Sequence, residues 1–323
     1  MFFHLKARLS FIFKNARSAA LPQSFMSCLV ALCCALETTT FSFYNAILAV
    51  LGVLSAHLSA NLFDDIFDYL QGKVDVRNYA CVGRAKKCAD IVDGKASLKD
   101  FINWAIGFGV ISVLIGLYFV FTVGFEVLYF ILIGAILILF YSAPPLKLSY
   151  RGLGELVIGL MFGPLLVLGI YYVSTGILSF HALILSIITG LLTTNIVYVH
   201  SMVDEKVDKL CEKKTLAIVL SSKINQLVVL SLFTFVPYLL AFRISIVLGC
   251  ILLTTLPLAV YLVYSLKTPS RLKLLFIQLP KKSWRPIIKF GNDYFYTRWL
   301  LARNFMTAFV GIISLYYVMR IVL

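Results

Sequence analysis

The chain has 323 residues, of which 61% are hydrophobic and 14% are charged, and its mean hydropathy is +0.94. These values lie far outside the range of soluble proteins, so they exclude a soluble globular enzyme and favour a single all-α membrane domain over residues 1–323. The net charge of +14 arises from 29 Lys and Arg against 15 Asp and Glu. Because no basic segment is interleaved with aromatic residues, we expect no nucleic-acid partner.

Nine apolar stretches approach the length of about 20 residues that a helix needs to cross a bilayer. In chain order they are 21–38, 42–68, 101–123, 125–141, 154–173, 180–203, 224–242, 244–266 and 299–322. They predict a polytopic bundle of about nine transmembrane helices. A count of eight stays open, because the fourth stretch is short and carries Glu126 at its start.

The basic residues are distributed unevenly between the two sides of this bundle. With a cytoplasmic N-terminus, 27 of the 29 Lys and Arg fall on the cytoplasmic side, and only Arg243 and Arg320 do not. Cytoplasmic loops of membrane proteins are enriched in Lys and Arg in this way. We therefore expect an integral protein of the bacterial inner membrane, in contact with membrane lipid, with its acid-rich helix ends facing the cytoplasm.

Two groups of acidic residues gather at the ends of the second and the sixth stretch. Steps of three and four residues put the polar side chains of each group on one helical face. These are Asn61, Asp65 and Asp68 in the first group, extended inward by His57, and His200, Asp204 and Asp208 in the second. Carboxylates at this spacing repel one another, and acids near a bilayer are costly, so a partner cation is expected.

Magnesium is the cation that this donor set favours, because it takes one or two carboxylates together with substrate phosphates. We therefore predict that Asp65, Asp68, Asp204 and Asp208 are catalytic residues that bind Mg²⁺ and hold a diphosphate. Basic residues that follow in the sequence could cover the remaining phosphate charge. They are Lys147, Arg151, Lys213 and Lys214.

Three other interpretations were weighed against the metal site. Each acid alone could mark a solvated helix end balanced by loop lysines. Ion-coupled secondary transporters also carry acids within the membrane, but the chain has no inverted repeat of comparable hydropathy, and its acids gather at one face instead of the midplane. A membrane scaffold without activity would explain neither acidic group.

These motifs resemble those of the UbiA superfamily of intramembrane prenyltransferases, in order from about residue 22 to residue 220. The first acidic group matches the form typical of the branch acting on 1,4-dihydroxy-2-naphthoate, and segment 141–155, with Pro144 and Pro145, is similar to that branch as well. Two positions depart from the pattern. Asp64 replaces an Asn, and His200 with Ser201 stands where that branch usually carries Asn.

The resemblance implies a central cavity and magnesium-dependent transfer of a polyprenyl group from polyprenyl diphosphate to an aromatic acceptor. The acceptor we expect is 1,4-dihydroxy-2-naphthoate, on the route to menaquinone. Other acceptors of the superfamily stay open, namely 4-hydroxybenzoate, homogentisate, haem and archaeal lipids. Beyond the four metal-binding acids, we expect a further set of residues to bind the substrates. They are Asn61, Tyr141, Lys147, Tyr150, Arg151, His200, Lys213 and Lys214.

Overall fold

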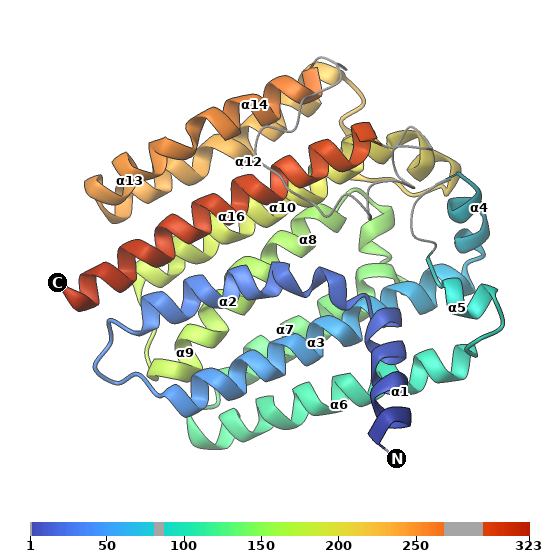
Figure 1. Ribbon diagram of the computed structural model, residues 1–323, viewed down its shortest axis with the longest axis horizontal. Coiled ribbons are helices and arrows are strands. Elements are labelled where there is room, and N and C mark those ends of the chain that lie inside the picture. The colour runs from blue at the N-terminus through green and yellow to red at the C-terminus, as the bar shows by residue number, and fades with distance from the viewer. Residues whose placement is uncertain (1, 81–86, 268–292) are drawn as a thin grey trace.

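Long apolar runs with few helix breakers fold as helices along most of the chain. The computed structural model describes residues 2–80, 87–267 and 293–323. Within these ranges the chain forms helices and no strand, apart from one isolated bridge between Arg151 and Lys214 (Figure 1). This confirms the prediction of an all-α bundle.

Eight helical spans in the described ranges are long and apolar enough to cross a membrane. They are Ser18–Ala35, Phe43–Leu70, Leu98–Thr122, Gly154–Thr175, Phe180–Leu210, Lys223–Ile244, Ile246–Lys267 and Thr297–Val322. A further apolar helix, α7 (Val127–Ser142), is shorter. It coincides with the fourth predicted stretch, so all nine stretches form helices close to where the sequence placed them.

Several of these spans consist of more than one helical element. The helices that form the bundle are α2 (Leu21–Ala35), α3 (Phe43–Leu70), α6 (Leu98–Thr122), α7, α8 (Gly154–Leu160), α9 (Gly169–Thr175), α10 (Phe180–Leu210), α12 (Lys223–Ile244), α13 (Ile246–Leu252), α14 (Leu256–Lys267) and α16 (Asp293–Val322). A π-helical turn, η3 (Met161–Leu168), joins α8 to α9 around Pro164. A proline cannot supply the amide of a regular helical hydrogen bond, which accounts for the irregular turn at this point.

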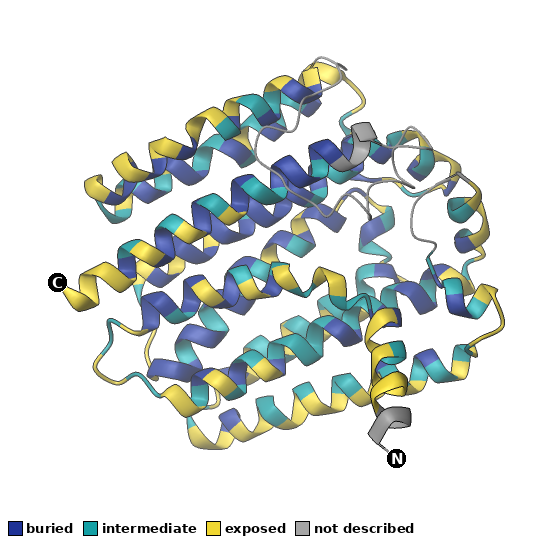
Figure 2. Ribbon diagram, in the orientation of Figure 1, coloured by how far each residue is buried: buried dark blue, intermediate teal, exposed yellow. Residues whose placement is uncertain are grey.

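Helix α10 forms the centre of the bundle, and α6 lies at its edge. In the most apolar window of each helix, 78% of the α10 residues are buried but only 17% of the α6 residues are (Figure 2). The exposed side chains of α6 are largely apolar, such as Ile106, Leu114 and Phe121. An apolar surface of this kind is stable against lipid and not against water, which fits a membrane-embedded chain.

The backbones of η3 and α10 approach each other closely at small residues. A Cβ atom added to Gly163 would lie 2.4 Å from the carbonyl oxygen of Ser186 and 2.6 Å from the Cα atom of Gly190. Only glycine leaves room for this contact, as is common where membrane helices cross. The crossing fixes the segment around Met161 and Phe162 against the central helix.

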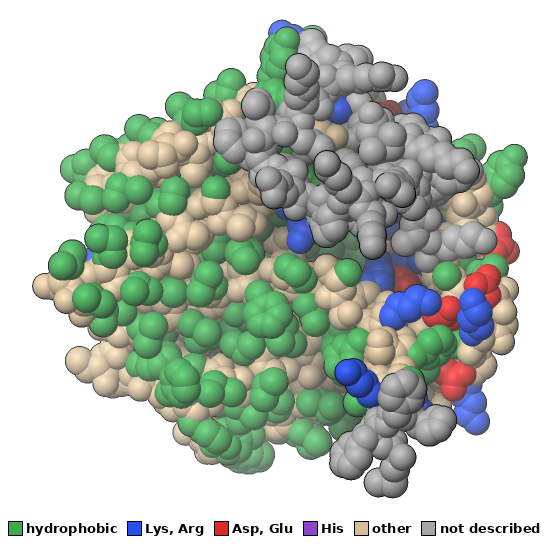
Figure 3. All heavy atoms as spheres, viewed as in Figure 1, with side chains coloured by type: hydrophobic (Ala, Val, Ile, Leu, Met, Phe, Trp, Pro, Cys, Tyr) green, Lys and Arg blue, Asp and Glu red, His purple; other side chains and the backbone are tan. Residues whose placement is uncertain are grey.

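The short elements gather at one end of the bundle. Helices α4 (Lys73–Ala80) and α5 (Ala89–Val92) lie beyond the end of α3, and α1 (Phe2–Asn15) crosses α6 on the outside (Figure 1). Aromatic contacts hold α1 there, since the Phe11 ring lies 5.9 Å from that of Trp104. Acidic and basic side chains concentrate at this end in the visible face, and hydrophobic ones cover much of the remainder (Figure 3). The polar end of the molecule is therefore the place to look for a site.

Candidate active site

The first acidic cluster lies at the end of α3 and consists of Asp64, Asp65 and Asp68. Lys87 reaches all three, with its Nζ 3.0 Å from Asp64 Oδ2 and 3.2 Å from Asp65 Oδ1, and it also contacts Asp68 Oδ2. Arg17 pairs with the first two, at 2.9 Å from Asp64 and 3.5 Å from Asp65. The three carboxylates are thus paired with two cations from other parts of the chain, which leaves one negative charge in excess.

Local backbone features position this cluster. Ser42 caps the start of α3 by accepting the amide of Asn45, and Gly72 ends the helical segment with a φ of +67°. Glycine adopts this left-handed conformation without the steric cost that other residues incur. The backbone of Lys87 is held by Asn78, whose side chain donates to the carbonyl of Lys87 and accepts from its amide. The ammonium group is therefore presented to the acids by a fixed loop.

Two hydroxyl groups complete the shell around the first cluster. Ser142 Oγ donates to Asp64 Oδ1 at 2.7 Å, and Tyr150 donates its hydroxyl to Asp68 Oδ1 at 2.7 Å. Burial of Tyr150, together with the negative charge of Asp68, raises the pKa of its phenol. Burial works against the charge on Lys87, but the carboxylates of Asp64, Asp68 and Asp65 outweigh it and raise the pKa of the ammonium.

The second cluster lies at the end of α10 and contains Asp204 and Asp208. Both are buried, and Arg77 of α4 contacts both, at 3.5 Å from Asp204 and 3.3 Å from Asp208. His200 Nδ1 lies 3.6 Å from Asp204 Oδ2, one helical turn away, as the sequence predicted. The second cluster has the same construction as the first, an acidic helix face covered by a basic side chain from the 73–99 segment.

Lys213 and Tyr150 lie between the two clusters. The ammonium of Lys213 stands 5.5 Å from the centre of the Tyr150 ring, and its positive charge acts on both Asp64 and Asp208. Its backbone amide donates to the carbonyl of Asp208. Since Tyr150 in turn bonds Asp68, the two acidic groups that are about 140 residues apart in the sequence belong to one polar site.

The other predicted substrate-binding residues are placed less uniformly. Asn61 and Tyr141 line a cavity beside Asp64. Lys214 pairs through its backbone with the 151–152 turn, where its carbonyl accepts the amide of Gly152 at 2.6 Å. Arg151 is exposed and donates to the carbonyl of Pro145, and Lys147 is half-buried in a left-handed turn. No contact of Lys147 or Arg151 with either acidic cluster is found in the described residues.

The cations that do contact the acids were not singled out from the sequence. Arg17, Arg77 and Lys87 are three of the 27 basic residues whose distribution predicts the topology. The chain itself therefore supplies three cations to the acids, each from a segment outside the helical turns that carry the acids. One signal was available for Arg77 and Lys87, since both lie in the basic loop that directly follows the first acidic group.

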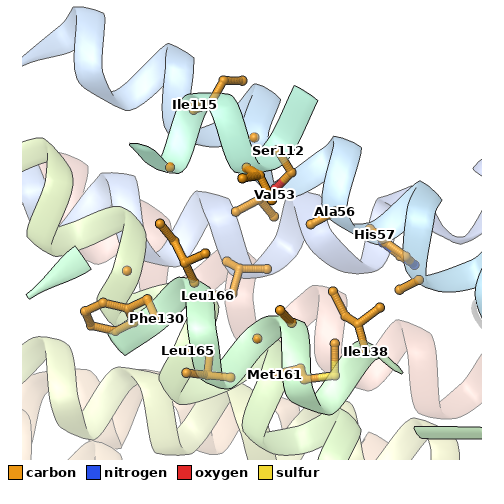
Figure 4. A pocket seen from close by; sticks show the side chains of 18 of the residues that line it. Val53, Ala56, His57, Ser112, Ile115, Phe130, Ile138, Met161, Leu165 and Leu166 are labelled. Carbon is orange, nitrogen blue, oxygen red and sulfur yellow. The ribbon is translucent and has the colours of Figure 1, made fainter. Parts of the chain in front are cut away.

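Two cavities adjoin this polar end. The larger, of about 370 Å³, is lined almost entirely by apolar side chains of α3, α6, α7 and η3, and we call it the apolar cavity (Figure 4). The smaller, of about 260 Å³, is bordered by Arg17, Asn61 and Asp64 as well as by Trp299 and Arg303, and we call it the polar cavity. Both are lined by His57, Ala60, Ile138, Met161 and Phe162. These shared residues place the two cavities next to each other.

His57 is the polar residue at this junction. Its Nδ1 lies 2.7 Å from Ser24 Oγ, and its ring meets that of Phe162 edge to face at 5.1 Å. In Figure 4 it stands at one end of the apolar cavity, with Phe130 at the opposite end. An elongated apolar group could therefore occupy the larger cavity while its polar end lies toward the acidic clusters.

The acidic residues suit a hard divalent cation by their chemistry. The five carboxylates of the two clusters carry oxygen atoms of the kind that such a cation prefers, and Asp65 Oδ1 is a buried acceptor that makes ion pairs but no hydrogen bond. No group of three or more His, Cys, Asp or Glu arranged to hold a metal by themselves is found in the described part of the chain. Pairs of carboxylates completed by oxygens of a phosphate ligand remain compatible with Mg²⁺, which retains non-protein ligands in many sites.

A membrane bundle with two acidic helix ends above an apolar cavity defines a class of membrane-embedded transferases, and the comparisons agree. The model of the UbiA prenyltransferase family matches residues 24–278, and the chain belongs to this family. Among curated proteins, 1,4-dihydroxy-2-naphthoate octaprenyltransferase of Bacillus subtilis is 26% identical over 166 residues. That similarity covers 51% of this chain and 51% of the relative, about half the length of each.

Two solved structures share the fold. A digeranylgeranylglyceryl phosphate synthase superposes with a TM-score of 0.61 at 14% identity, over 97% of this chain and 98% of that protein. A UbiA homologue from Archaeoglobus fulgidus, bound to GPP and Mg²⁺, gives a TM-score of 0.56 at 14% identity, over 94% and 99% of the two chains. At this identity the likeness establishes a common architecture.

Proposed function

We propose that this protein transfers a polyprenyl group from polyprenyl diphosphate to an aromatic acceptor, with Mg²⁺ as cofactor. The observation that carries the proposal is the pair of acidic clusters, bridged by Tyr150 and Lys213, beside an apolar cavity. Its membership of the UbiA prenyltransferase family supports the reaction class. The A. fulgidus homologue bound to GPP and Mg²⁺ supports the donor and the metal.

The acidic residues and the basic residues of the site would have different roles in binding the diphosphate. Asp65, Asp68, Asp204 and Asp208 would hold Mg²⁺, which supplies positive charge to the diphosphate as it leaves. The chain's own cations beside these acids would bind the phosphate oxygens through charge-assisted hydrogen bonds. They are Arg17, Arg77, Lys87 and Lys213.

The apolar cavity would bind the prenyl chain and keep water from its reacting carbon. A positively charged allylic group survives only where water is excluded, and the cavity walls of Ala, Ile, Leu, Val and Phe provide this. The acceptor would enter the polar cavity, which lies beside the first acidic cluster and shares His57 and Phe162 with the apolar one. The donor carbon and the acceptor ring would then meet at the junction.

We propose 1,4-dihydroxy-2-naphthoate as the acceptor, which would place the protein in menaquinone synthesis. The similarity to the B. subtilis octaprenyltransferase supports this choice. For the cell, we propose the bacterial inner membrane with the acidic clusters facing the cytoplasm, supported by the 27 basic residues on that side. The transporter interpretation loses support, because the acids lie at the helix ends and are paired with basic side chains.

The test is a transfer assay with membranes containing the protein, one labelled prenyl diphosphate and several acceptors. We expect prenylated naphthoate with Mg²⁺ and none with excess chelator. Asp65→Asn and Asp208→Asn should each remove most activity while the protein remains folded in the membrane, and Asp93→Asn, which removes an exposed acid paired with Lys95, should not. Normal turnover of both variants, or exclusive use of 4-hydroxybenzoate, would contradict the site or the acceptor respectively.

A further inference from the structure

Arg303 is a cation near the start of a membrane-spanning helix, and no acid in the described part of the chain neutralises it. It lies in the span Thr297–Val322 and lines the polar cavity. Its guanidinium carbon lies 4.7 Å from the centre of the ring of Trp299, which is one helical turn earlier in α16. This cation–π contact holds the guanidinium group in place. A charged residue at such a place is costly, and it usually marks a ligand or a pathway.

The arginines with comparable settings already have partners. Arg17, at the other end of the same cavity, pairs with Asp64 and Asp65, and Arg320, further along α16, pairs with Glu37 at 3.1 Å. Among the described residues, the ion pairs that hold the two acidic clusters come from segments other than α16. Arg303 is therefore available for an anionic ligand other than the diphosphate.

The walls of the polar cavity indicate the shape of that ligand. Trp299, Tyr141 and Phe162 supply aromatic surface, and Gln23 crosses from α2 to donate to Thr193 Oγ1 at 3.0 Å. Aromatic walls favour a flat, aromatic ligand. A guanidinium group recognises a carboxylate by two parallel hydrogen bonds, which a single lysine ammonium cannot reproduce.

We infer that Arg303 binds the carboxylate of the aromatic acceptor in the polar cavity. The inference rests on the proposed function and assigns a specificity-determining residue to it. With the carboxylate at Arg303 and the ring against Trp299 and Tyr141, the remainder of the ring extends toward His57, where the apolar cavity begins. The protein thereby selects an aromatic carboxylate over the same ring without one.

The experiment measures binding of a matched ligand pair to the purified protein in detergent, independently of turnover. The probes are 1-hydroxy-2-naphthoate and 1-naphthol, which differ by the carboxylate. We expect wild-type protein to bind the naphthoate at least ~10-fold more tightly, Arg303→Gln to bind both probes equally, and Arg303→Lys to keep a smaller preference. Arg320→Gln, on the same helix but paired with Glu37, should keep the full preference.

Transfer assays on the same variants separate this inference from the proposed function. Arg303→Gln should raise the KM for a carboxylated acceptor ~10-fold or more and leave the KM for prenyl diphosphate unchanged. If the wild type transfers prenyl groups but Arg303→Gln keeps the preference for the naphthoate, the inference is wrong and the function stands. If the naphthoate preference depends on Arg303 but no acceptor is prenylated, the proposed function is wrong and the carboxylate site stands.

Discussion

Replacing Lys87 by Met tests the ion-pair network at the first acidic cluster. The side chain of Lys87 is only 12% exposed, and its ammonium lies 3.0 Å from Asp64 and 3.2 Å from Asp65 and contacts Asp68 as well. Without it, the hydroxyl of Tyr150 is the side-chain partner that Asp68 keeps among the described residues, while Asp64 and Asp65 share Arg17. Removing one partner of a buried ion pair costs about 3–5 kcal/mol, because the remaining charge stays uncompensated.

Thermal unfolding in detergent measures this loss. The buried cysteines Cys28, Cys33 and Cys34 become reactive to a fluorogenic maleimide as the bundle opens, so no added label is needed. In chelator, Lys87→Met should lower the midpoint by about 6–10 °C, taking roughly 2 °C per kcal/mol for a chain of this size. Mg²⁺ should raise the midpoint of the variant more than that of the wild type, because the carboxylates that have lost Lys87 gain a cation.

The matched control is Lys95→Met. The ammonium of Lys95 also bonds a carboxylate, that of Asp93 at 3.0 Å, but both side chains are exposed. An exposed pair contributes at most about 1 kcal/mol, so the midpoint should hardly move. Equal midpoints for the two variants in chelator would refute the buried network. If Mg²⁺ does not change the unfolding midpoint of Lys87→Met, metal binding by these acids is refuted.

Three further predictions follow from single positions. Gly134→Leu should reduce transfer from long prenyl diphosphates more than from a ten-carbon donor, because Gly134 lines the apolar cavity and a Cβ there meets nothing within 4 Å; equal losses for all donors would contradict this use of the cavity. Gly163→Ala should lower the free energy of unfolding by about 1–3 kcal/mol, because the added Cβ forces η3 away from α10. Gly311→Ala has open space at its Cβ and should raise the free energy of unfolding by about 0.5–1 kcal/mol. The same thermal unfolding assay measures both. In a background where Cys81 and Cys250 are replaced by Ser, Glu212→Cys should react with an impermeant thiol reagent only from the cytoplasmic side, and reaction in intact cells would contradict this orientation.

The helices and the acidic groups could be predicted from the sequence because each depends on local spacing. Hydropathy sets the position of a membrane helix, and steps of three and four residues put Asp65 with Asp68 and Asp204 with Asp208 on single faces. The structure keeps these placements and buries all four side chains. What it adds is Asp64, which the sequence marked only as a departure and which shares Lys87 and Arg17 with its neighbour.

The partners of the acids could not be predicted, because they depend on how distant segments return to one end of the bundle. Arg77 reaches Asp208 across 131 positions, and Arg17 reaches Asp64 across 47. Hydropathy and spacing carry no information on such pairs. Lys147 and Arg151 lie within the recognisable segment 141–155, which is why the sequence pointed to them. The turn at 148–150 nevertheless directs Arg151 to the carbonyl of Pro145 and not to the acids.

The buried carboxylate of Glu155 joins two loops of the site. Both of its oxygens accept the amide of Leu216, at 3.1 and 3.2 Å, and the carbonyl of Lys214 accepts the amide of Gly152 nearby. These hydrogen bonds fix the turn before α8 and the segment that carries Lys213 relative to each other. A chimaera that exchanges residues 143–155 with a homologue should misfold unless residues 212–216 are exchanged with them, and in evolution the two segments should change together.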